Sequence, residues 1–439
     1  MNDSLKKPNI ILFITHDTGN YFSCYGGPVK TPNIDNLAEK GVKFTQNYST
    51  APQCSPSRGS MITGKMPHSN GLMGLVNLGW NLPEDNETIP KILGRNGYST
   101  HLIGLQHEHR YAKKIGYDTV SPRYDAPYFG RSVQKRASNL LDDVEKGEIK
   151  QPFYCSVGFF ETHRPFVSGM TMRTDWKYIE IPEYLPDTKG VRKEISHFEG
   201  SVKEFDKRIG QILDHLSEKP FAGNTIVIFT VDHGIPFPRA KGTLHDPGCH
   251  TALIAYMPRK IAGGKTYDCL ISGMDLFPTI LNLAGVKLTT ELKKEIQGKS
   301  FYNLLMEKQY DPRDHVYMEL TFHDQGYNAM RGIRTEKWKY IKNFASLDNQ
   351  FQIPVDFINQ SSGKDYREAH PDYKKPRPDE ELYNLEDDPS EIHNIAEDPQ
   401  YKAVIEDLRG RLMKFLKETN DPILEKEPTE PKHPGFIIY

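Results

Sequence analysis

The sequence predicts an α/β protein whose large domain is built on a mostly parallel sheet flanked by helices. Three observations predict this class: continuous apolar runs of strand length, apolar helical stripes between them, and a change of pattern after residue 312. An apolar run that does not alternate with polar residues indicates a strand buried on both faces, as in parallel sheets. Such strands alternating with helices are typical of a layered α/β domain.

The first domain is expected to span residues 1–312 and to begin with a strongly buried strand. Buried strands are predicted at residues 9–14, 100–104, 153–159 and 225–231. After the first of them, Thr31 can cap a helix that has Pro32 in its first turn and ends before Gly41. Further helices are indicated by residues 276–283 and by the apolar stripe of Val202, Phe205, Ile209, Ile212, Leu213 and Leu216.

The second domain, residues 313–439, is expected to be a smaller α+β unit with an antiparallel sheet and a helix. Short strands are predicted at residues 316–320 and 338–341, and an amphipathic helix at residues 401–416. The stretch 359–380 is polar and contains prolines, and we interpret it as a long surface excursion.

The composition argues against several classes of partner. The chain has 56 basic and 58 acidic residues, without a basic stretch interleaved with aromatics, so no nucleic-acid partner is expected. No apolar run approaches the roughly 18 residues that cross a bilayer, so no membrane partner is expected. Residues 1–7 lack the apolar segment of a signal peptide. We therefore expect a cytoplasmic protein, or a periplasmic or secreted one whose signal peptide has been removed.

Polar side chains follow each of the four buried strands. They are Thr15, His16 and Asp17; His107, Glu108 and His109; Glu161 and His163; and Asp232, His233 and Lys241. In open α/β sheets, ligands bind at the carboxyl ends of the strands. A single Asp there is usually a cap or turn residue, and a single His a core or surface residue. Two Asp/His pairs, each closing a buried strand, instead predict a site for a divalent cation.

The segment Cys54 to Gly64, CSPSRGSMITG, is the most specific in the chain. Pro56 can start a helix, which places Cys54 at a helix N-terminus, where free N–H groups favour an anion. Arg58 lies one turn further along the same face and offers a cationic fork. The alternative is a buried structural cysteine before a capped helix, and the spacing alone does not decide between the two.

This Cys-x-Pro-x-Arg segment ending in Thr-Gly resembles the signature of the sulfatases, which is read by the enzyme that oxidises the cysteine to formylglycine. Residues 8–12, 275–280 and 381–385 also resemble blocks of that family. Other segments are similar to those of the N-sulfoglucosamine sulfohydrolases, or heparan N-sulfatases, within it: residues 71–75, 232–238 and 418–422. The resemblance implies an alkaline-phosphatase-like large domain and a smaller C-terminal α+β subdomain that completes the substrate pocket.

The resemblance also implies the chemistry. A sulfate group would be hydrolysed from a saccharide, expected to be N-sulfoglucosamine of heparin-type glycans. Cys54, converted to formylglycine and hydrated, would attack sulfur with one hydroxyl group and expel sulfate with the help of the other. A divalent ion, calcium in most of the family, would assist. Its expected ligands are His16, Asp17, Cys54, Asp232 and His233.

The same resemblance implies a role for each remaining side chain of the site. Arg58 should hold the diol, and Lys241 should contact the sulfate. His107 should act as the base during sulfate release, and His163 should protonate the leaving group. The side chains expected to bind the substrate are His109, Glu161, Arg239 and His323.

Two features depart from the family pattern. His16 and His233 stand where an acid and an asparagine are common, and imidazole suits manganese or zinc better than calcium, so these ions are alternatives. Leu105 stands where most sulfatases have a sulfate-binding lysine. The candidates to replace that lysine are His109, Arg110 and Arg239.

Three other functions remain open. The protein could act on an O-sulfated glycan or aryl sulfate, hydrolyse phosphate or phosphonate esters, or bind sulfated glycans without catalysis. A phosphate-ester enzyme would usually have Thr or Ser as the nucleophile, and His107, His163 and Lys241 argue against a mere binder. The expected partners are a sulfated saccharide and the formylglycine-generating enzyme, and the sequence leaves open whether the protein forms a homodimer.

Overall fold

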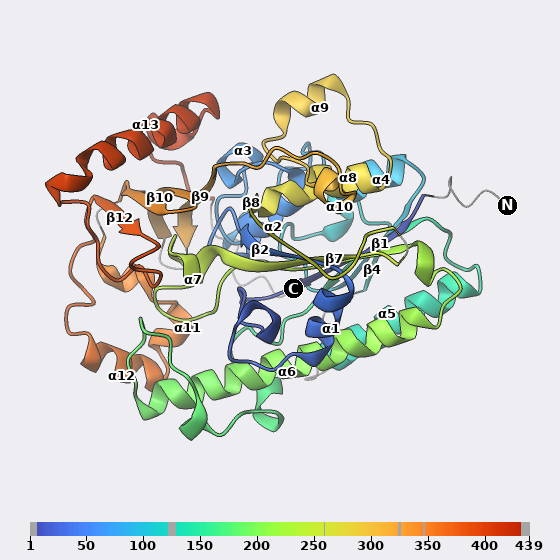
Figure 1. Cartoon of the computed structure of the whole chain (residues 1–439), viewed down its shortest axis with the longest axis horizontal. Coiled ribbons are helices and arrows are strands. Elements are labelled where there is room, and N and C mark those ends of the chain that lie inside the picture. The colour runs from blue at the N-terminus through green and yellow to red at the C-terminus, as the bar shows by residue number, and fades with distance from the viewer. Residues whose placement is uncertain (1–6, 122–128, 259, 324–325, 346, 432–439) are drawn as a thin grey trace.

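A computed structural model describes residues 7–121, 129–258, 260–323, 326–345 and 347–431 (Figure 1). Residues 1–6, on which the expectation about a signal peptide depends, lie outside the described residues. The described chain forms an eight-stranded sheet in the order β4-β3-β5-β1-β6-β7-β2-β8 and a four-stranded sheet in the order β12-β11-β10-β9. No helix within the described ranges is long and apolar enough to span a membrane.

The large sheet is mostly parallel, as predicted. Its strands are β1 (Asn9–Thr15), β2 (Val42–Tyr48), β3 (Ser99–Gly104), β4 (Thr119–Ser121), β5 (Phe153–Gly158), β6 (Thr225–Val231), β7 (His250–Tyr256) and β8 (Lys265–Ser272). Only β7 runs antiparallel to its neighbours, β6 and β2, while the other pairs are parallel. All residues of β1, β5 and β6 are buried, which agrees with their continuous apolar sequences.

Helices cover both faces of this sheet (Figure 1). Ile11 and Phe13 of β1 pack into one apolar core, whereas Ile10, Leu12 and Ile14 pack into another, because successive side chains of a strand point to opposite faces. The first core is covered by α1 (Pro32–Lys40), α5 (Phe129–Glu145) and α6 (Lys189–Ser217). The second is covered by α2 (Cys54–Thr63), α4 (Ile89–Arg95) and α8 (Leu276–Leu283).

The small sheet is antiparallel, as predicted, and carries the last helix. Its strands are β9 (His315–His323), β10 (Gly326–Thr335), β11 (Trp338–Asn343) and β12 (Glu380–Asn384), and the helix is α13 (Lys402–Glu418). The buried side of α13 packs on apolar residues of β10, β11 and β12. The shorter helices are α3 (Pro67–Asn70), α7 (Asp246–Cys249), α9 (Thr290–Glu295), α10 (Tyr302–Leu305), α11 (Val355–Ile358) and α12 (Ser361–Ala369).

The stretch 359–380 is not simply a surface excursion. It contains α12, whose Tyr366 is buried and belongs to the core beneath α6. Asp365 accepts a hydrogen bond of 3.0 Å from the backbone N–H of Gly190, at the start of α6. The polar composition misled the prediction because this helix buries only one side and exposes the rest.

A buried ionic cluster joins helix α3 of the large domain to the small sheet, and we call it the His68 cluster. It consists of His68 on α3, Glu319 on β9, Arg331 on β10 and Asp421 after α13, all buried. Nε of Arg331 lies 2.6 Å from Oδ2 of Asp421, and Nη2 lies 3.1 Å from Oδ1. His68 contacts Glu319 and lies 3.5 Å from Asp421. The cluster therefore fastens the end of the chain to the helix that follows α2.

Candidate active site

Four neighbouring strands deliver the predicted side chains to one edge of the large sheet. Strands β3, β5, β1 and β6 are adjacent in this order and run parallel. Their carboxyl ends therefore lie side by side, and the polar residues that follow them can meet.

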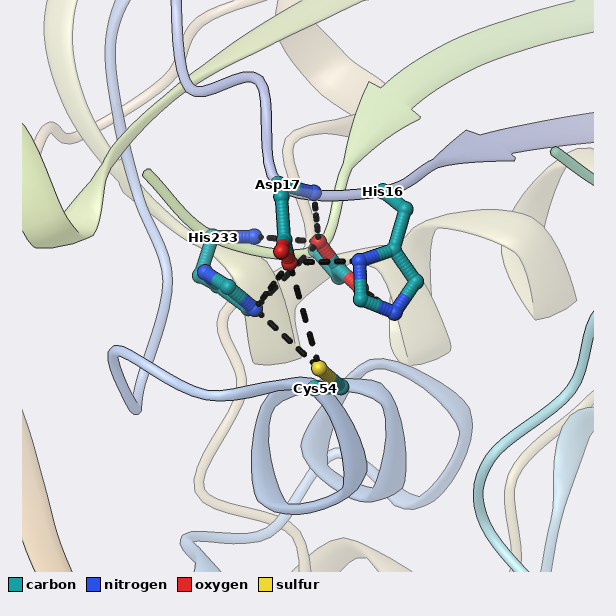
Figure 2. Close-up of side chains that lie close together, drawn as sticks. His16, Asp17, Cys54 and His233 are labelled. Atoms are coloured by element: carbon teal, nitrogen blue, oxygen red, sulfur yellow. Dashed lines mark hydrogen bonds and ion pairs between the residues drawn. The ribbon is translucent and has the colours of Figure 1, made fainter. Parts of the chain in front are cut away.

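Five of these residues form one buried cluster, which we call the Cys54 cluster. It consists of His16, Asp17, Cys54, Asp232 and His233, and one nitrogen, oxygen or sulfur atom of each lies within 4.8 Å of the others. Figure 2 shows the Cys54 side chain pointing from the start of α2 toward His16, Asp17 and His233 at the strand ends. The structure thus brings together all the residues predicted as metal ligands.

The backbone after β1 is tied to the backbone after β6 through one carboxylate. Oδ1 of Asp232 accepts hydrogen bonds of 2.9 Å from the backbone N–H groups of Asp17 and His233. Asp17 adopts a left-handed backbone conformation with φ of 45°. Such a conformation is costly for a residue with a side chain and is concentrated at functional sites.

Two cations balance the two buried carboxylates. Nζ of Lys241 lies 2.8 Å from Oδ2 of Asp17, and Nε of Arg58 lies 2.9 Å from Oδ2 of Asp232. Burial alone would raise the pKa of both carboxyl groups. His16, together with these cations, instead holds both pKa values below their ordinary range, so both groups are ionised at neutral pH.

The thiol of Cys54 is positioned by the first turn of α2. The helix begins at Cys54, two residues before Pro56, and all ten of its residues are buried. Sγ lies 3.3 Å from Nε2 of His233 and 3.9 Å from Oδ1 of Asp17. Burial raises the pKa of this thiol well above its ordinary value, even though Lys241 and Arg58 lower it. The unmodified thiol is therefore protonated and is a weak nucleophile at neutral pH.

His163 lies beside the Cys54 cluster. Its ring stacks on Phe160 with centroids 4.7 Å apart and meets the ring of His16 edge-on at 5.0 Å. Nδ1 lies 2.7 Å from the carbonyl oxygen of Arg164, which fixes the ring. Burial, followed by the charge of Lys241, lowers the pKa of His163 to about 4.

Glu108 is a buried acid near the site that the sequence reading assigned no role. Its Oε2 accepts a 2.7 Å hydrogen bond from the backbone N–H of His107, and its charge acts on Arg58. Burial raises the pKa of Glu108, and Arg58 opposes that shift. The sequence contained a signal for Glu108, because this residue belongs to the same polar run after β3 as His107. Leu105, in the position of the missing lysine, is buried and brings no charge.

Three residues expected to bind substrate make the following contacts within the protein. Nδ1 of His109 lies 3.1 Å from the carbonyl oxygen of Tyr111. Glu161 accepts a hydrogen bond from its neighbour Phe160, and its carboxylate lies against Gly130 of α5. The guanidinium group of Arg239 contacts the carbonyl oxygen of Glu391 and lines a separate cavity of about 580 Å³.

The fourth residue expected to bind substrate, His323 at the end of β9, is placed near the site. Its ring faces Gly242, the residue that follows Lys241.

Asp356 on α11 also lies near the site, although the sequence reading assigned it no role. Burial alone would raise the pKa of this carboxyl group, but the charges of Lys241, Arg164 and His163 lower it. The residue follows no predicted strand and belongs to no motif, so the sequence pattern offered no signal for it.

A mostly parallel sheet with this buried set of thiol, carboxylate and imidazole groups at its carboxyl edge defines an α/β enzyme with a candidate metal-binding active site. Residues 8–286 match the family described as Sulfatase, and residues 239–357 match the domain described as N-sulphoglucosamine sulphohydrolase, C-terminal. Because the first match covers more than half of the chain, the chain belongs to the sulfatase family.

Individual relatives agree with this assignment. The chain is 26% identical to the human N-sulphoglucosamine sulphohydrolase, over 94% of this chain and 91% of that protein. It is also 26% identical to an ulvan-active sulfatase of Formosa agariphila, over 95% of this chain and 76% of that protein. A structure solved in complex with its substrate, D-glucosamine-2-N,6-O-disulfate, shares the fold with a TM-score of 0.74 and 21% identity, covering 96% of this chain and 100% of that chain.

These findings confirm the predicted fold class and the predicted family. The protein is therefore a sulfatase, a hydrolase of sulfate esters or sulfamates.

Proposed function

We propose that the protein removes the sulfate group from N-sulfoglucosamine in heparin-type saccharides, with formylglycine derived from Cys54 at the reacting position. The observation that carries the proposal is the thiol of Cys54 at the start of α2, directed into the Cys54 cluster. The choice of sugar is supported by the match of residues 239–357 to the C-terminal domain of N-sulphoglucosamine sulphohydrolases. Residues 1–312 form the catalytic domain in this proposal, and residues 313–439 complete the substrate pocket.

The Cys54 cluster fits a divalent ion. Nδ1 of His16 lies 2.5 Å from Oδ1 of Asp17, which in turn lies 2.9 Å from Nε2 of His233. Two imidazoles, two carboxylates and a thiol thus direct ligand atoms to one buried place, which is the arrangement that a cation requires. His16, Asp17, Cys54, Asp232 and His233 would hold the ion, which supplies positive charge to a sulfate oxygen when bound. Calcium is the first candidate, and the two imidazoles favour manganese or zinc as alternatives.

The protein's own side chains position the sulfate group and move protons. Formylglycine supplies, as its hydrate, a nucleophilic hydroxyl group and a route for sulfate release. Arg58 and Lys241 stabilise negative charge on the reacting oxygens, because both are buried cations beside Cys54. His163 donates a proton to the leaving nitrogen or oxygen, and a bound sulfate anion would raise its pKa toward the protonated form. His107 takes a proton during sulfate release.

The role of Cys54 can be tested by mass spectrometry and kinetics together. We expect the tryptic peptide that contains Cys54 to carry formylglycine in active protein. Cys54→Ala should reduce desulfation of N-sulfoglucosamine to background, whereas Cys269→Ala, at a half-buried cysteine outside the cluster, should keep it. An active preparation with only thiol at position 54, or full activity of Cys54→Ala, would refute the proposal.

Metal removal tests the proposed ligands. A chelator should lower the thermal unfolding temperature and the activity, because removing a ligand bound to the folded state destabilises that state. Calcium, magnesium, manganese and zinc are then added back separately, and both quantities are measured for each ion. Full recovery with calcium alone would exclude the softer ions, and an unfolding temperature insensitive to chelator and to all four ions would contradict the metal site.

An O-sulfated saccharide is the second candidate substrate. The observation in its favour is a relative described as N-acetylglucosamine-6-O-sulfatase, from Bacteroides thetaiotaomicron, which is 23% identical over 98% of this chain and 89% of that protein. Parallel assays on N-sulfated and O-sulfated glucosamine distinguish the two candidates, since a higher kcat/KM on the O-sulfated sugar would favour the second.

A further inference from the structure

Helix α11 brings an acidic side chain from the C-terminal part of the chain to the active site. The helix is short, and its Phe357 is fully buried against Phe237, with ring centroids 5.9 Å apart. Phe237 belongs to the loop that follows β6 and leads to Lys241. This packing holds the neighbouring Asp356 beside that loop, where its charge acts on Lys241, His163 and Asp17.

The carboxylate of Asp356 has no hydrogen-bond partner among the residues that the structure describes. Both of its oxygen atoms are buried and unbonded, although the side chain as a whole is 30% exposed. The nearest cation is Arg164, whose Nη1 lies 3.6 Å from Oδ1, which is beyond hydrogen-bond distance. Buried polar atoms are nearly always bonded in native proteins, so two unbonded carboxylate oxygens beside an active site require an explanation.

Arg164 does not supply the missing bonds in this structure, although its Nη2 is itself buried and has no hydrogen-bond partner among the described residues. Its Nε lies 2.5 Å from Oε1 of Glu194, and its Nη1 contacts the carbonyl oxygen of Pro236. The guanidinium group also lies 4.8–5.1 Å from the ring centroids of Phe166, Phe237 and Phe357. Nε and Nη1 of Arg164 are therefore held, and the charges of Lys241 and Arg164 keep Asp356 ionised without occupying its acceptor positions.

We propose that Asp356 binds hydroxyl groups of the sugar that carries the scissile sulfate, and that it rejects a second anionic group at the same position. The inference rests on the proposed function. An ionised carboxylate accepts hydrogen bonds from hydroxyl groups, and Lys241 and Arg164, which also act on other groups, neutralise it only in part. A sulfate ester in place of that hydroxyl offers no donor and is repelled. The preferred substrate is thus a sugar ring with a free hydroxyl group facing α11.

Kinetics on two substrates separate this role from a merely structural one. Asp356→Asn and Asp356→Ala are compared with the wild type on N-sulfoglucosamine and on para-nitrophenyl sulfate, which has no sugar hydroxyl groups. We expect kcat/KM on the sugar to fall about 10- to 100-fold, the usual worth of a hydrogen bond to a charged group, with little change on the aryl sulfate. Equal losses on both substrates would make Asp356 a positioning residue for Lys241 and His163 and would overturn the proposal.

A second sulfate tests the rejection of anions. Disulfated glucosamines with the additional group on each remaining hydroxyl in turn are assayed with the wild type and with Asp356→Asn. At least one of them should be a poor substrate for the wild type and improve several-fold in the variant. An unchanged order of preference in Asp356→Asn would contradict the proposal.

Binding measurements on catalytically inactive variants test the role of Asp356 without relying on catalytic activity. Calorimetric titration of N-sulfoglucosamine into Cys54→Ala and into the Cys54→Ala, Asp356→Ala double variant should show about tenfold weaker binding by the latter. Equal affinities would overturn the inference, while absent desulfation by the wild type would count against the proposed function alone. Asp372→Ala is the matched control, because this acid is 71% exposed and pairs with Lys375. Unfolding temperatures confirm that each variant is folded.

Discussion

His245 is a buried histidine between the two sheets, and its titration should affect stability. Nδ1 lies 3.1 Å from Oγ1 of Thr243, and Nε2 lies 3.2 Å from Oε2 of Glu381 on β12. Burial, followed by the charge of Arg239, lowers the pKa of His245 from 6.5 to about 4, although Glu381 opposes the shift. The folded protein therefore keeps this imidazole neutral at pH values where the unfolded chain protonates it.

The sign of the resulting pH dependence follows from that difference. As the pH falls from 6.5 toward 4, the unfolded state binds the proton first, so the free energy of unfolding decreases. The full shift corresponds to roughly 3 kcal/mol. His245→Gln, which cannot titrate, should remove this part of the decrease in urea unfolding measured from pH 7 to pH 5. Parallel curves for the variant and the wild type would contradict the prediction.

At the residue scale, sequence reasoning found the side chains that follow buried strands and missed those placed by packing. The ligand-type residues after β1 and β6 meet because parallel strands end at the same edge. Asp356 reaches the site through the packing of Phe357, which no local pattern records. Arg239 has a left-handed backbone with φ of 59° and lines the cavity of about 580 Å³, and its role in substrate binding stays a prediction.

At the element scale, the end of α2 depends on a glycine. Gly64 has φ of 70°, and a Cβ atom there would lie 2.9 Å from the ring of Phe277 on α8. Gly64→Ala should therefore cost about 1 kcal/mol for the left-handed backbone and more for the displaced ring. Gly26→Ala is the control, because Gly26 has φ of 81° and open space around it. Denaturant unfolding should show the larger loss for Gly64→Ala, and equal losses would exclude a role for the Phe277 contact.

Among the strands that the sequence predicts, those buried on both faces have the most accurate bounds. Strands β1 and β6 have uninterrupted apolar sequences, and their predicted bounds agree with the structure within a residue. Strand β8 was missed, since it lies at the sheet edge and its first five residues are only partly buried or exposed. Helix α6 was recognised only in its second half, from the stripe at residues 202–216. Its first half carries fewer large apolar residues, and several of its buried positions are small or polar.

At the scale of the whole molecule, the His68 cluster should contribute strongly to stability. Replacing Arg331 with Met would leave Glu319 and Asp421 buried without their cation, which typically costs 3–5 kcal/mol. Arg95→Met removes a surface pair with Glu87 and should cost at most about 1 kcal/mol. Chemical unfolding of both variants measures the difference, and a similar small loss in each would show that the cluster does not stabilise the fold.

The order of synthesis gives the His68 cluster a further consequence. Glu319 lies 251 positions after His68, and Asp421 lies 90 positions after Arg331. The ribosome therefore produces both sheets before it produces the acid that completes the cluster. Until then Arg331 lacks the carboxylate that binds both its Nε and its Nη2. Burying the guanidinium group without that carboxylate would cost free energy. We therefore expect the contact of α3 with the small sheet to be fixed only when the last residues of the chain have been synthesised, later than the packing of α2 on α8 in the large domain.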